Sequence, residues 1–154
     1  AVAMVDPSDW AVVNNPDPSD RLHLRTAAKA DARSLGKFYN GTPVHVLGRS
    51  GAWAKVKLCG LTGYMKAEYL AFGQDMLQVA WAFPDLYLVE GAAEKGVSVY
   101  AKPSTKAEVT GRFDENNEGY LNVIGVAGDD WVYVMGEEGT CGYMQRSFLY
   151  GGNG

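Results

Sequence analysis

Two cysteines and two histidines are the residues of this chain best suited to nucleophilic or metal chemistry, and their placement favours neither. His23 and His45 both fall in predicted strands of the N-terminal half, without a nearby cysteine in a strand-to-helix setting. Zinc needs three or four converging ligands, whereas Cys59 and Cys141 lie far apart and show no ligand spacing. We therefore predict no catalytic residue, no metal site and no cofactor.

Paired carboxylates are the other residues that could do chemistry, as general acids and bases. They sit in turn-like segments, where solvated surface charge is the ordinary reason for their presence. No glycine-rich loop precedes a helix in the way that would cradle a phosphate. The sequence thus predicts a protein that is not an enzyme; the pairs are Asp129-Asp130, Glu137-Glu138 and Asp114-Glu115.

Two tryptophans stand on the polar faces of predicted strands. In residues 53–58 the small apolar side chains share one face, so Trp53 falls on the other face with two lysines. Trp131 likewise falls on the face opposite to that of Val132 and Val134. Such a ring is either covered by a loop or forms part of a groove on which a flat or extended ligand stacks, and both remain open. The candidate ligand-binding residues are Trp53, Tyr69, Tyr39, Trp131, Phe148 and Tyr100.

An internal repeat places these aromatic residues in two copies. The offset is 78 residues at the tryptophans, 79 at the following glycines and 75 earlier in each copy, and such drift is typical of turn insertions in a duplicated domain. The repeat predicts one domain at residues 1–72, an ordered connector or extra strand at 73–84, and a second domain at 85–154. The matching runs are Trp53-Ala54-Lys55-Val56 with Gly63-Tyr64-Met65, and Trp131-Val132-Tyr133-Val134 with Gly142-Tyr143-Met144.

Alternation of apolar and polar residues predicts strands throughout the chain. Turns rich in glycine, asparagine and aspartate separate the strands at the spacing of a small antiparallel barrel or sandwich. Helix signals are weak, with a turn or two expected only in 26–33 or 65–70. The predicted fold class is all-β; the alternating runs are 22–25, 44–46, 54–58, 97–99, 121–123 and 132–134.

Several segments of the first copy resemble a bacterial SH3 (SH3b) domain. They are Leu22-His23-Leu24-Arg25, Leu35-Gly36, the run 41–47, Trp53-Ala54-Lys55-Val56-Lys57, and the ending 63–70. The second copy is more diverged, with Tyr100 where the arginine usually sits and Phe148 in place of Tyr69. The resemblance covers about residues 11–70 and 87–149 and implies two small SH3-like antiparallel β-barrels in tandem.

The resemblance also implies a setting and a ligand class. SH3b domains are typically secreted or surface-attached accessories of cell-wall enzymes, and some bind peptidoglycan or its peptide cross-bridges. We therefore expect a secreted or cell-surface protein whose signal peptide has been removed, and a non-catalytic module that recognises cell-wall peptide or glycan. The alternative is a structural or protein-interaction module whose aromatic grooves are closed by packing, with another protein as its partner.

Charge and hydropathy exclude two partner classes. Residues 1–72 hold nine Lys and Arg against six Asp and Glu, a net of +3, and residues 73–154 hold five against twelve, a net of −7. The basic half lacks a dense basic run, so we expect no nucleic-acid partner. No apolar run approaches the roughly 20 residues that a membrane span requires, so we expect no membrane-spanning segment.

The two cysteines do not occupy matching positions of the repeat. Cys59 lies four residues before Gly63, whereas Cys141 directly precedes Gly142. Two buried free thiols are the expected state, and a bridge between the copies is the alternative.

Overall fold

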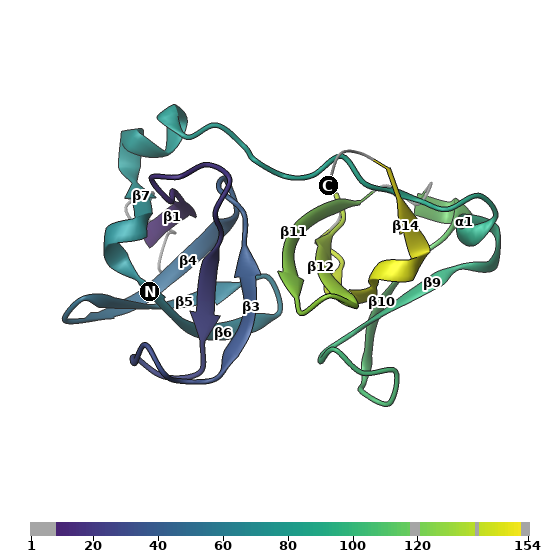
Figure 1. Ribbon diagram of the computed structural model, residues 1–154, viewed down its shortest axis with the longest axis horizontal. Helices are drawn as coiled ribbons and strands as arrows, with labels where there is room; N and C mark the ends of the chain where they lie inside the picture. The colour runs from purple at the N-terminus through teal and green to yellow at the C-terminus, as the bar shows by residue number, and fades with distance from the viewer. Residues whose placement is uncertain (1–8, 118–120, 138, 152–154) are drawn as a thin grey trace, which may run out of the picture. The chain divides into compact units, whose positions relative to one another are not determined.

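The computed structural model describes residues 9–117, 121–137 and 139–151. The chain divides into two compact units, Ala1–Ala82 and Phe83–Gly154 (Figure 1). Strands dominate both units and every helix is short, which confirms the all-β class predicted from the alternating pattern.

The first unit contains seven antiparallel strands, of which β4, β5 and β6 form a meander. The strand order in the sheet is β3-β2-β6-β5-β4-β1-β7, so that β1 lies between β4 and the last strand. A 3-10 helix of one turn separates β6 from β7. The elements are β1 (Trp10–Val13), β2 (Leu22–Arg25), β3 (Ser34–Phe38), β4 (Pro43–Ser50), β5 (Trp53–Leu58), β6 (Leu61–Lys66), η2 (Ala67–Tyr69), β7 (Leu70–Phe72) and η3 (Gly73–Gln78).

The second unit has five strands in the order β10-β9-β13-β12-β11 and a separate two-stranded pair, β14-β8. Its helices are again short. The elements are β8 (Tyr87–Leu88), α1 (Ala92–Lys95), β9 (Val97–Tyr100), β10 (Val109–Phe113), η4 (Glu115–Asn117), β11 (Asn122–Ala127), β12 (Trp131–Met135), β13 (Cys141–Gln145), η5 (Arg146–Phe148) and β14 (Leu149–Tyr150).

The main strands of the two units follow the same order along the chain, and several of their pairings recur. Arg25 of β2 pairs with Tyr64 of β6, and Tyr100 of β9 pairs with Tyr143 of β13. The β4–β5 and β11–β12 ladders each contain one register shift, at Leu47 and at Ile124. A register shift of this kind is a β-bulge, which bends and twists the strand that carries it.

Each unit has its own apolar core. The predicted alternation is found in β5, whereas in β12 Tyr133 is buried together with Val132 and Val134. In β5 the residues Ala54, Val56 and Leu58 are fully buried, whereas Lys55 and Lys57 are exposed. In the second unit Val132 and Val134 of β12 occupy the corresponding interior positions. Burial of these side chains supplies most of the driving force for folding each unit.

Two architectural expectations concern the closure of the sheets and the segment after β7. Among the described residues the strand pairings run as open ladders, so closure of each unit into a barrel is not shown. In the segment expected as a connector or extra strand, residues Gly73–Gln78 form a 3-10 helix and not a strand. Its apolar residues are not all packed, since Leu77 is 84% exposed.

The expected free thiols are absent from the structure. Neither Cys59 nor Cys141 is free, both are disulfide-bonded, and both are half-buried. The expectation of two buried free thiols is therefore wrong. It rested on the scarcity of cysteine in the chain, which does not determine whether a disulfide forms.

In the part of the chain that the structure describes, no helix has the length and apolar character needed to cross a bilayer.

Candidate functional site

A cavity of about 420 Å³ in the first unit brings two of the predicted aromatic residues together. Trp53 and Tyr69 both line it, beside charged side chains from β2, from β6 and from the loop before β2. We call this cavity the N-terminal groove. Its lining residues are Asn15, Pro16, Asp17, Asp20, Arg21, Leu22, His23, Arg25, Ala30, Trp53, Lys66 and Tyr69.

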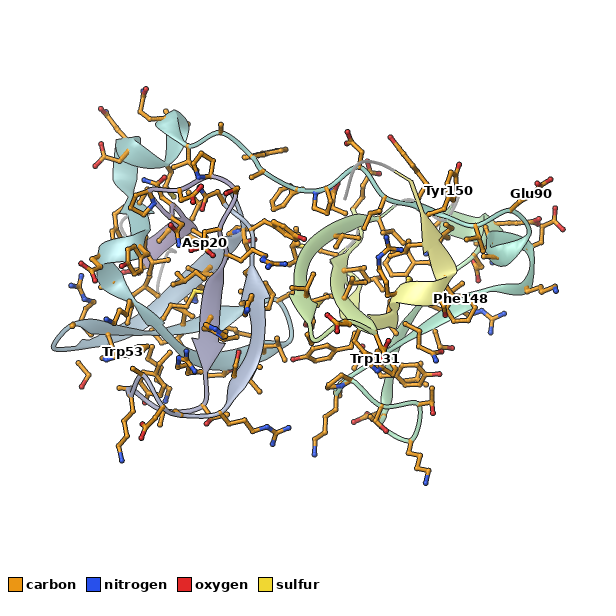
Figure 2. The ribbon with its side chains drawn as sticks, viewed as in Figure 1. Asp20, Trp53, Glu90, Trp131, Phe148 and Tyr150 are labelled. Carbon is orange, nitrogen blue, oxygen red and sulfur yellow. The ribbon has the colours of Figure 1, made fainter. Side chains whose placement is uncertain are left out.

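The aromatic wall of the groove follows from the register of β5 and β6. Trp53, labelled in Figure 2, begins β5 on the outward face and is half-buried, and its Cα partner on β6 is Lys66. Tyr69 follows in η2, whose first residue is held by a hydrogen bond from the Ala67 backbone N–H to the carbonyl oxygen of Ala52 at 2.9 Å. Both residues lie in regular elements and both line the cavity, and we call their two rings the aromatic platform.

The opposite wall is the loop of residues 14–20, which a buried asparagine fastens to the unit. The Asn40 side chain is only 4% exposed. Its Oδ1 accepts a hydrogen bond from the Asn15 backbone N–H at 2.7 Å, and its Nδ2 donates to the Asn15 carbonyl oxygen at 3.0 Å. The Asn14 backbone N–H donates to the Tyr69 carbonyl oxygen at 2.8 Å. The loop is therefore anchored at its start to both sides of the groove.

Two arginines of the groove differ in their hydrogen bonding. Arg25 donates from Nη1 to the Ala32 carbonyl oxygen at 2.9 Å and so holds the loop between β2 and β3. The Arg21 guanidinium lies over the Tyr39 ring, 5.8 Å from its centroid. Its Nε atom is buried and has no hydrogen-bond partner among the described residues. A buried donor without a partner is costly, so Arg21 is suited to receive an acceptor atom from a ligand.

Acidic side chains stand at the same groove. The Ser19 hydroxyl and backbone N–H donate to Asp17 Oδ1 at 2.7 and 3.0 Å, and these hydrogen bonds lower the pKa of the Asp17 carboxyl. Asp20 Oδ1 accepts from the Arg21 backbone N–H at 2.8 Å. The groove thus presents fixed negative charge on its loop and positive charge on β2 and β6.

His23 is the titratable group at the floor of the groove. Its Nδ1 lies 2.7 Å from the Ser34 hydroxyl oxygen. Burial lowers the pKa of His23, and the charges of Arg25, Lys37 and Arg21 lower it further, against the opposing effect of Asp20. The neutral imidazole is the form that this environment favours.

The corresponding positions of the second unit are arranged differently. Tyr100, which occupies the place of Arg25, packs its ring edge against Trp131 with centroids 6.0 Å apart and planes at 81°. Gln145 replaces Lys66 as the Cα partner of the tryptophan. Phe148 lies in η5, as Tyr69 lies in η2. The second unit therefore pairs its aromatic side chains with each other.

The sequence reasoning found part of this site and missed the rest. Of the predicted residues, Trp53 and Tyr69 both line the groove. Tyr39 does not line it, but its ring lies under the guanidinium of Arg21, which does. The sequence reasoning treated the segment 14–20 only as a separator between strands, and so missed Asp17 and Asp20. The proline and aspartate content of that segment signals a turn, but nothing in it signals that Asn40, 25 residues from Asn15, anchors the turn at the cavity that Trp53 lines.

The described residues contain no cluster of three or more His, Cys, Asp or Glu side chains that could hold a metal ion. The groove instead offers ring faces, hydrogen-bond donors and charges of both signs. A set of this kind has the chemistry needed to hold a polar ligand in one orientation.

Comparisons with known proteins give one informative match. No curated protein matches the chain. Among solved structures, NlpC2 from Trichomonas vaginalis shares 12% sequence identity, with 97% of this chain and 50% of that chain covered at a TM-score of 0.39. NlpC1 from the same organism shares 13%, with 99% and 48% covered at the same TM-score. The chain thus spans about half the length of each. Residues 20–71, which hold most of the groove, match the family model of the bacterial SH3 domain.

Proposed function

We propose that the chain is a non-catalytic tandem SH3b module whose first unit binds peptide or glycan of the bacterial cell wall in the N-terminal groove. The observation that carries this proposal is the cavity that joins Trp53 and Tyr69 to charged side chains of both signs. It lies largely within the residues that match the bacterial SH3 domain. The aromatic platform and the charges together suit a polar, extended ligand.

The second unit is proposed as a second SH3b domain, and the two domains as closed barrels. The support is the repeated connectivity: both units have the order hairpin, three-stranded meander, 3-10 turn and final strand. Both also place a bulge at the same point of the meander. A shared register with a shared irregularity is typical of duplication, because bulges persist within families.

The chemistry of the groove limits the class of ligand that it could bind. The carboxylates of Asp17 and Asp20 are placed to accept hydrogen bonds from an amino group, and Arg21 and Lys66 to donate to a carboxylate or carbonyl oxygen. The rings of Trp53 and Tyr69 offer faces for a sugar or an extended backbone. Cell-wall peptide and glycan both supply such groups.

A structural or protein-interaction role is the second candidate, and the second unit favours it. Tyr100 packs against Trp131 in an edge-to-face contact, so part of the aromatic surface of the second unit is already taken up by packing within the unit. The ring contact itself is worth about 0.5–1.5 kcal/mol. We therefore assign ligand binding to the first unit and a supporting role to the second.

A secreted or cell-surface location is proposed with this function. The match to a bacterial SH3 domain supports it, since such domains are typical of cell-wall-associated proteins. The oxidised state of both cysteines agrees with it, because disulfides persist mainly in oxidising compartments.

The test is co-sedimentation of the full chain with purified peptidoglycan. Trp53→Ala removes the platform, and we expect apparent affinity to fall about tenfold, the loss of about 1.4 kcal/mol that is ordinary for an aromatic anchor. Trp131→Ala is expected to bind within about twofold of the parent chain, because its ring already packs on Tyr100.

Lys57→Gln is the matched control, because it removes a positive charge of β5 outside the groove. Lys57 is exposed on the same strand as Trp53 but does not line the groove. Circular dichroism of each variant separates loss of binding from loss of fold. Absence of any sedimentation of the parent chain, or equal losses for Trp53→Ala and Trp131→Ala, would refute the proposed function.

A further inference from the structure

Three basic side chains of the N-terminal groove lie on one face of the chain at β2. Successive residues of a strand point to opposite faces, and Leu22 and Leu24 are buried. Arg21, His23 and Arg25 therefore share the outward face, and all three line the cavity. Side chains two residues apart on a strand are separated by about 7 Å along it, so the three form a row.

A fourth basic side chain reaches the groove from the neighbouring strand. Arg25 pairs with Tyr64 of β6, so these two side chains share a face, and Lys66 lies two residues further along β6 on that same face. Lys66 is half-buried and lines the same cavity. We call Arg21, His23, Arg25 and Lys66 the basic cluster.

Within the described residues, no carboxylate forms an ion pair with the basic cluster. The ion pair that these residues contain joins Arg112 to Asp114 in the second unit. Asp17 and Asp20, which also line the groove, accept hydrogen bonds from neighbouring residues of the chain. The described lining holds three Lys and Arg against two Asp, a net charge of +1 while the histidine is neutral.

The positive charges of the groove repel one another at His23. The charged groups around it come from its own strand, from β3, from β6 and from the loop before β2; they are Arg21, Arg25, Lys37, Lys66 and Asp20. Burial lowers the pKa of His23, the cations of β2 and β3 lower it further, and the carboxylate acts in the opposite direction. A bound anion would offset this repulsion, whereas a neutral carbonyl oxygen would do so far less.

We propose that the basic cluster binds a carboxylate of the wall peptide, and that protonation of His23 strengthens this binding. The inference rests on the proposed function of the groove. A guanidinium group matches a carboxylate with two parallel hydrogen bonds. The single negative charge of a carboxylate also equals the net positive charge of the described lining. The adjoining part of the peptide lies on the aromatic platform, which lines the same cavity.

The probe is a pentapeptide of glycine and alanine with an acetylated N-terminus, because its α-carboxylate is then its one charge. The isotope-labelled full chain is titrated with it and followed by NMR. We expect shifts of the backbone amide resonances of residues 21–25 and of the indole N–H of Trp53. The same peptide with a C-terminal amide is expected to bind at least about tenfold more weakly, because its charge-assisted hydrogen bonds are lost.

A further amidated peptide, with glutamate at its centre, distinguishes a terminal from a side-chain carboxylate. If it binds as the free acid does, the groove accepts a side-chain carboxylate. If it binds as weakly as the first amidated peptide, the groove requires the terminal carboxylate. Both results support a carboxylate at the basic cluster, and they identify its source.

The role of His23 is tested by pH. A bound carboxylate favours the protonated imidazole, so affinity rises as the pH falls. We expect the free acid to bind about threefold more tightly at about pH 5 than at about pH 8. The α-carboxyl group stays ionised over this range, since its own pKa is about 3.5. The amidated peptide, and the free acid with the His23→Asn variant, should show no such gain.

Variants of the chain test the fixed charges. Arg21→Gln and Lys66→Gln each remove one positive charge from the groove, and we expect each to weaken binding of the free acid about threefold. Arg33→Gln is the matched control, since Arg33 is an exposed arginine of the same unit outside the groove. Circular dichroism checks the fold of each variant.

The outcomes separate this inference from the proposed function. Equal affinity for the free acid and the amide, or no shift with either peptide in a chain that sediments with peptidoglycan, would overturn the carboxylate site and leave the proposed function in place. A pH-independent affinity for the free acid would overturn the role of His23. A chain that binds neither these peptides nor peptidoglycan would refute both.

Discussion

One exchange, Arg25 in the first unit for Tyr100 in the second, changes what the neighbouring tryptophan can do. Arg25 extends to the Ala32 carbonyl oxygen and leaves the face of Trp53 to the groove. Tyr100 turns its ring against Trp131. The two residues occupy the same place in the register, since Arg25 pairs with Tyr64 and Tyr100 pairs with Tyr143. This exchange is one of the differences between the two sites, beside Gln145 in place of Lys66.

His23 gives a prediction about pH. The pKa of His23 is lowered from 6.5 in the folded unit, whereas the unfolded chain titrates near 6.5. Above that pH both states hold a neutral imidazole. As the pH falls below it, the unfolded state binds more protons, so the free energy of unfolding decreases until the folded histidine also becomes protonated.

The measurement is urea denaturation of the full chain between about pH 8 and about pH 5. We expect the stability of the first unit to fall below about pH 6.5 with a slope of at most about 1.4 kcal/mol per pH unit. His23→Asn, which keeps a polar group near Ser34, should remove that part of the slope. A profile that is identical in the variant and the parent chain would contradict the assignment.

In each unit one glycine allows two neighbouring strands to lie close together, because it has no Cβ atom. A Cβ atom on Gly63 of β6 would come within 2.6 Å of the Arg25 carbonyl oxygen and 3.0 Å of the Leu24 side chain. A Cβ on Gly142 of β13 would come within 2.9 Å of the Val99 Cβ. These glycines are the repeated residues of the sequence, and their physical role is to let β6 reach β2 and β13 reach β9.

Gly63→Ala is therefore expected to destabilise the first unit by about 1–3 kcal/mol, the usual cost of overpacking against backbone. Gly48→Ala is its control, because Gly48 lies in β4 where an added methyl group would have nothing within 4 Å, and its effect should stay within about 0.5 kcal/mol. Thermal denaturation followed by near-ultraviolet circular dichroism measures both. Equal destabilisation by the two substitutions would show that the close approach is not the cause.

The strands that could be predicted are those with one buried face. Residues 22–25 and 54–58 alternate clearly, and the structure has β2 and β5 there with the expected residues inside. β1 was missed because all four of its residues are apolar, which hides the alternation. β8 has two residues, too few to show any period. Turns at 14–20 were recognised, but their tertiary placement depends on Asn40 and has no local signal.

The sequence predicts where the two tryptophans lie in the strands, but it does not predict what their rings contact. The offset of the repeat predicts that Trp53 and Trp131 occupy equivalent places, and the register of each unit agrees. Whether a ring is open or packed depends on contacts with residues distant in sequence, as between Tyr100 and Trp131. The alternation of a strand predicts which face a side chain is on, and leaves its neighbours on that face undetermined.

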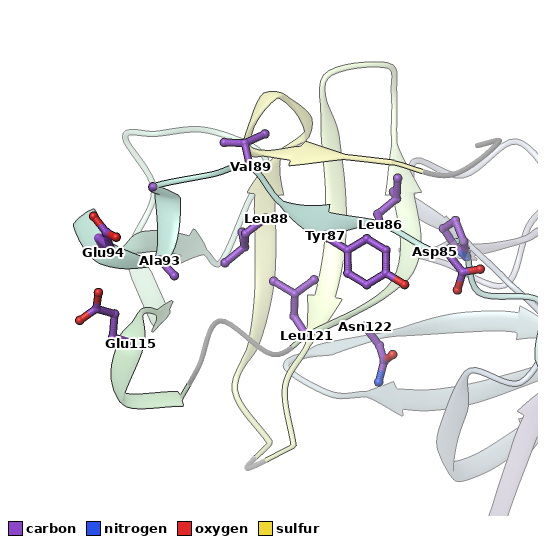
Figure 3. Close-up of a pocket in the computed structure, with 12 residues that line it drawn as sticks. Asp85, Leu86, Tyr87, Leu88, Val89, Ala93, Glu94, Glu115, Leu121 and Asn122 are labelled. Atoms are coloured by element: carbon purple, nitrogen blue, oxygen red, sulfur yellow. The ribbon is translucent and has the colours of Figure 1, made fainter.

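At the scale of the whole molecule, charge separates the two units more sharply than fold does. Residues 1–82 hold nine Lys and Arg against seven Asp and Glu, a net of +2, and residues 83–154 hold five against eleven, a net of −6. The groove of the first unit is lined by Arg21, Arg25 and Lys66 against two aspartates, Asp17 and Asp20. The cavity of the second unit shown in Figure 3 is lined by Asp85, Glu94 and Glu115, with no Lys, Arg or His among its described lining residues. The units therefore favour ligands of opposite charge.

A titration of the full chain with two simple peptides tests this separation. Hexaglutamate is expected to shift backbone amide resonances of the first unit, and hexalysine those of the second. Raising the salt concentration from about 50 mM to about 500 mM shortens the screening length and should weaken both effects, whereas a glycine–serine peptide of equal length should shift neither set. If both charged peptides shifted the same unit, or if salt left the shifts unchanged, the charge difference between the units would not govern what they bind. With the predicted result, two units with a similar order of strands would present an anion-binding face and a cation-binding face on the same chain, since the exchange of a few exposed side chains is enough to reverse the local potential.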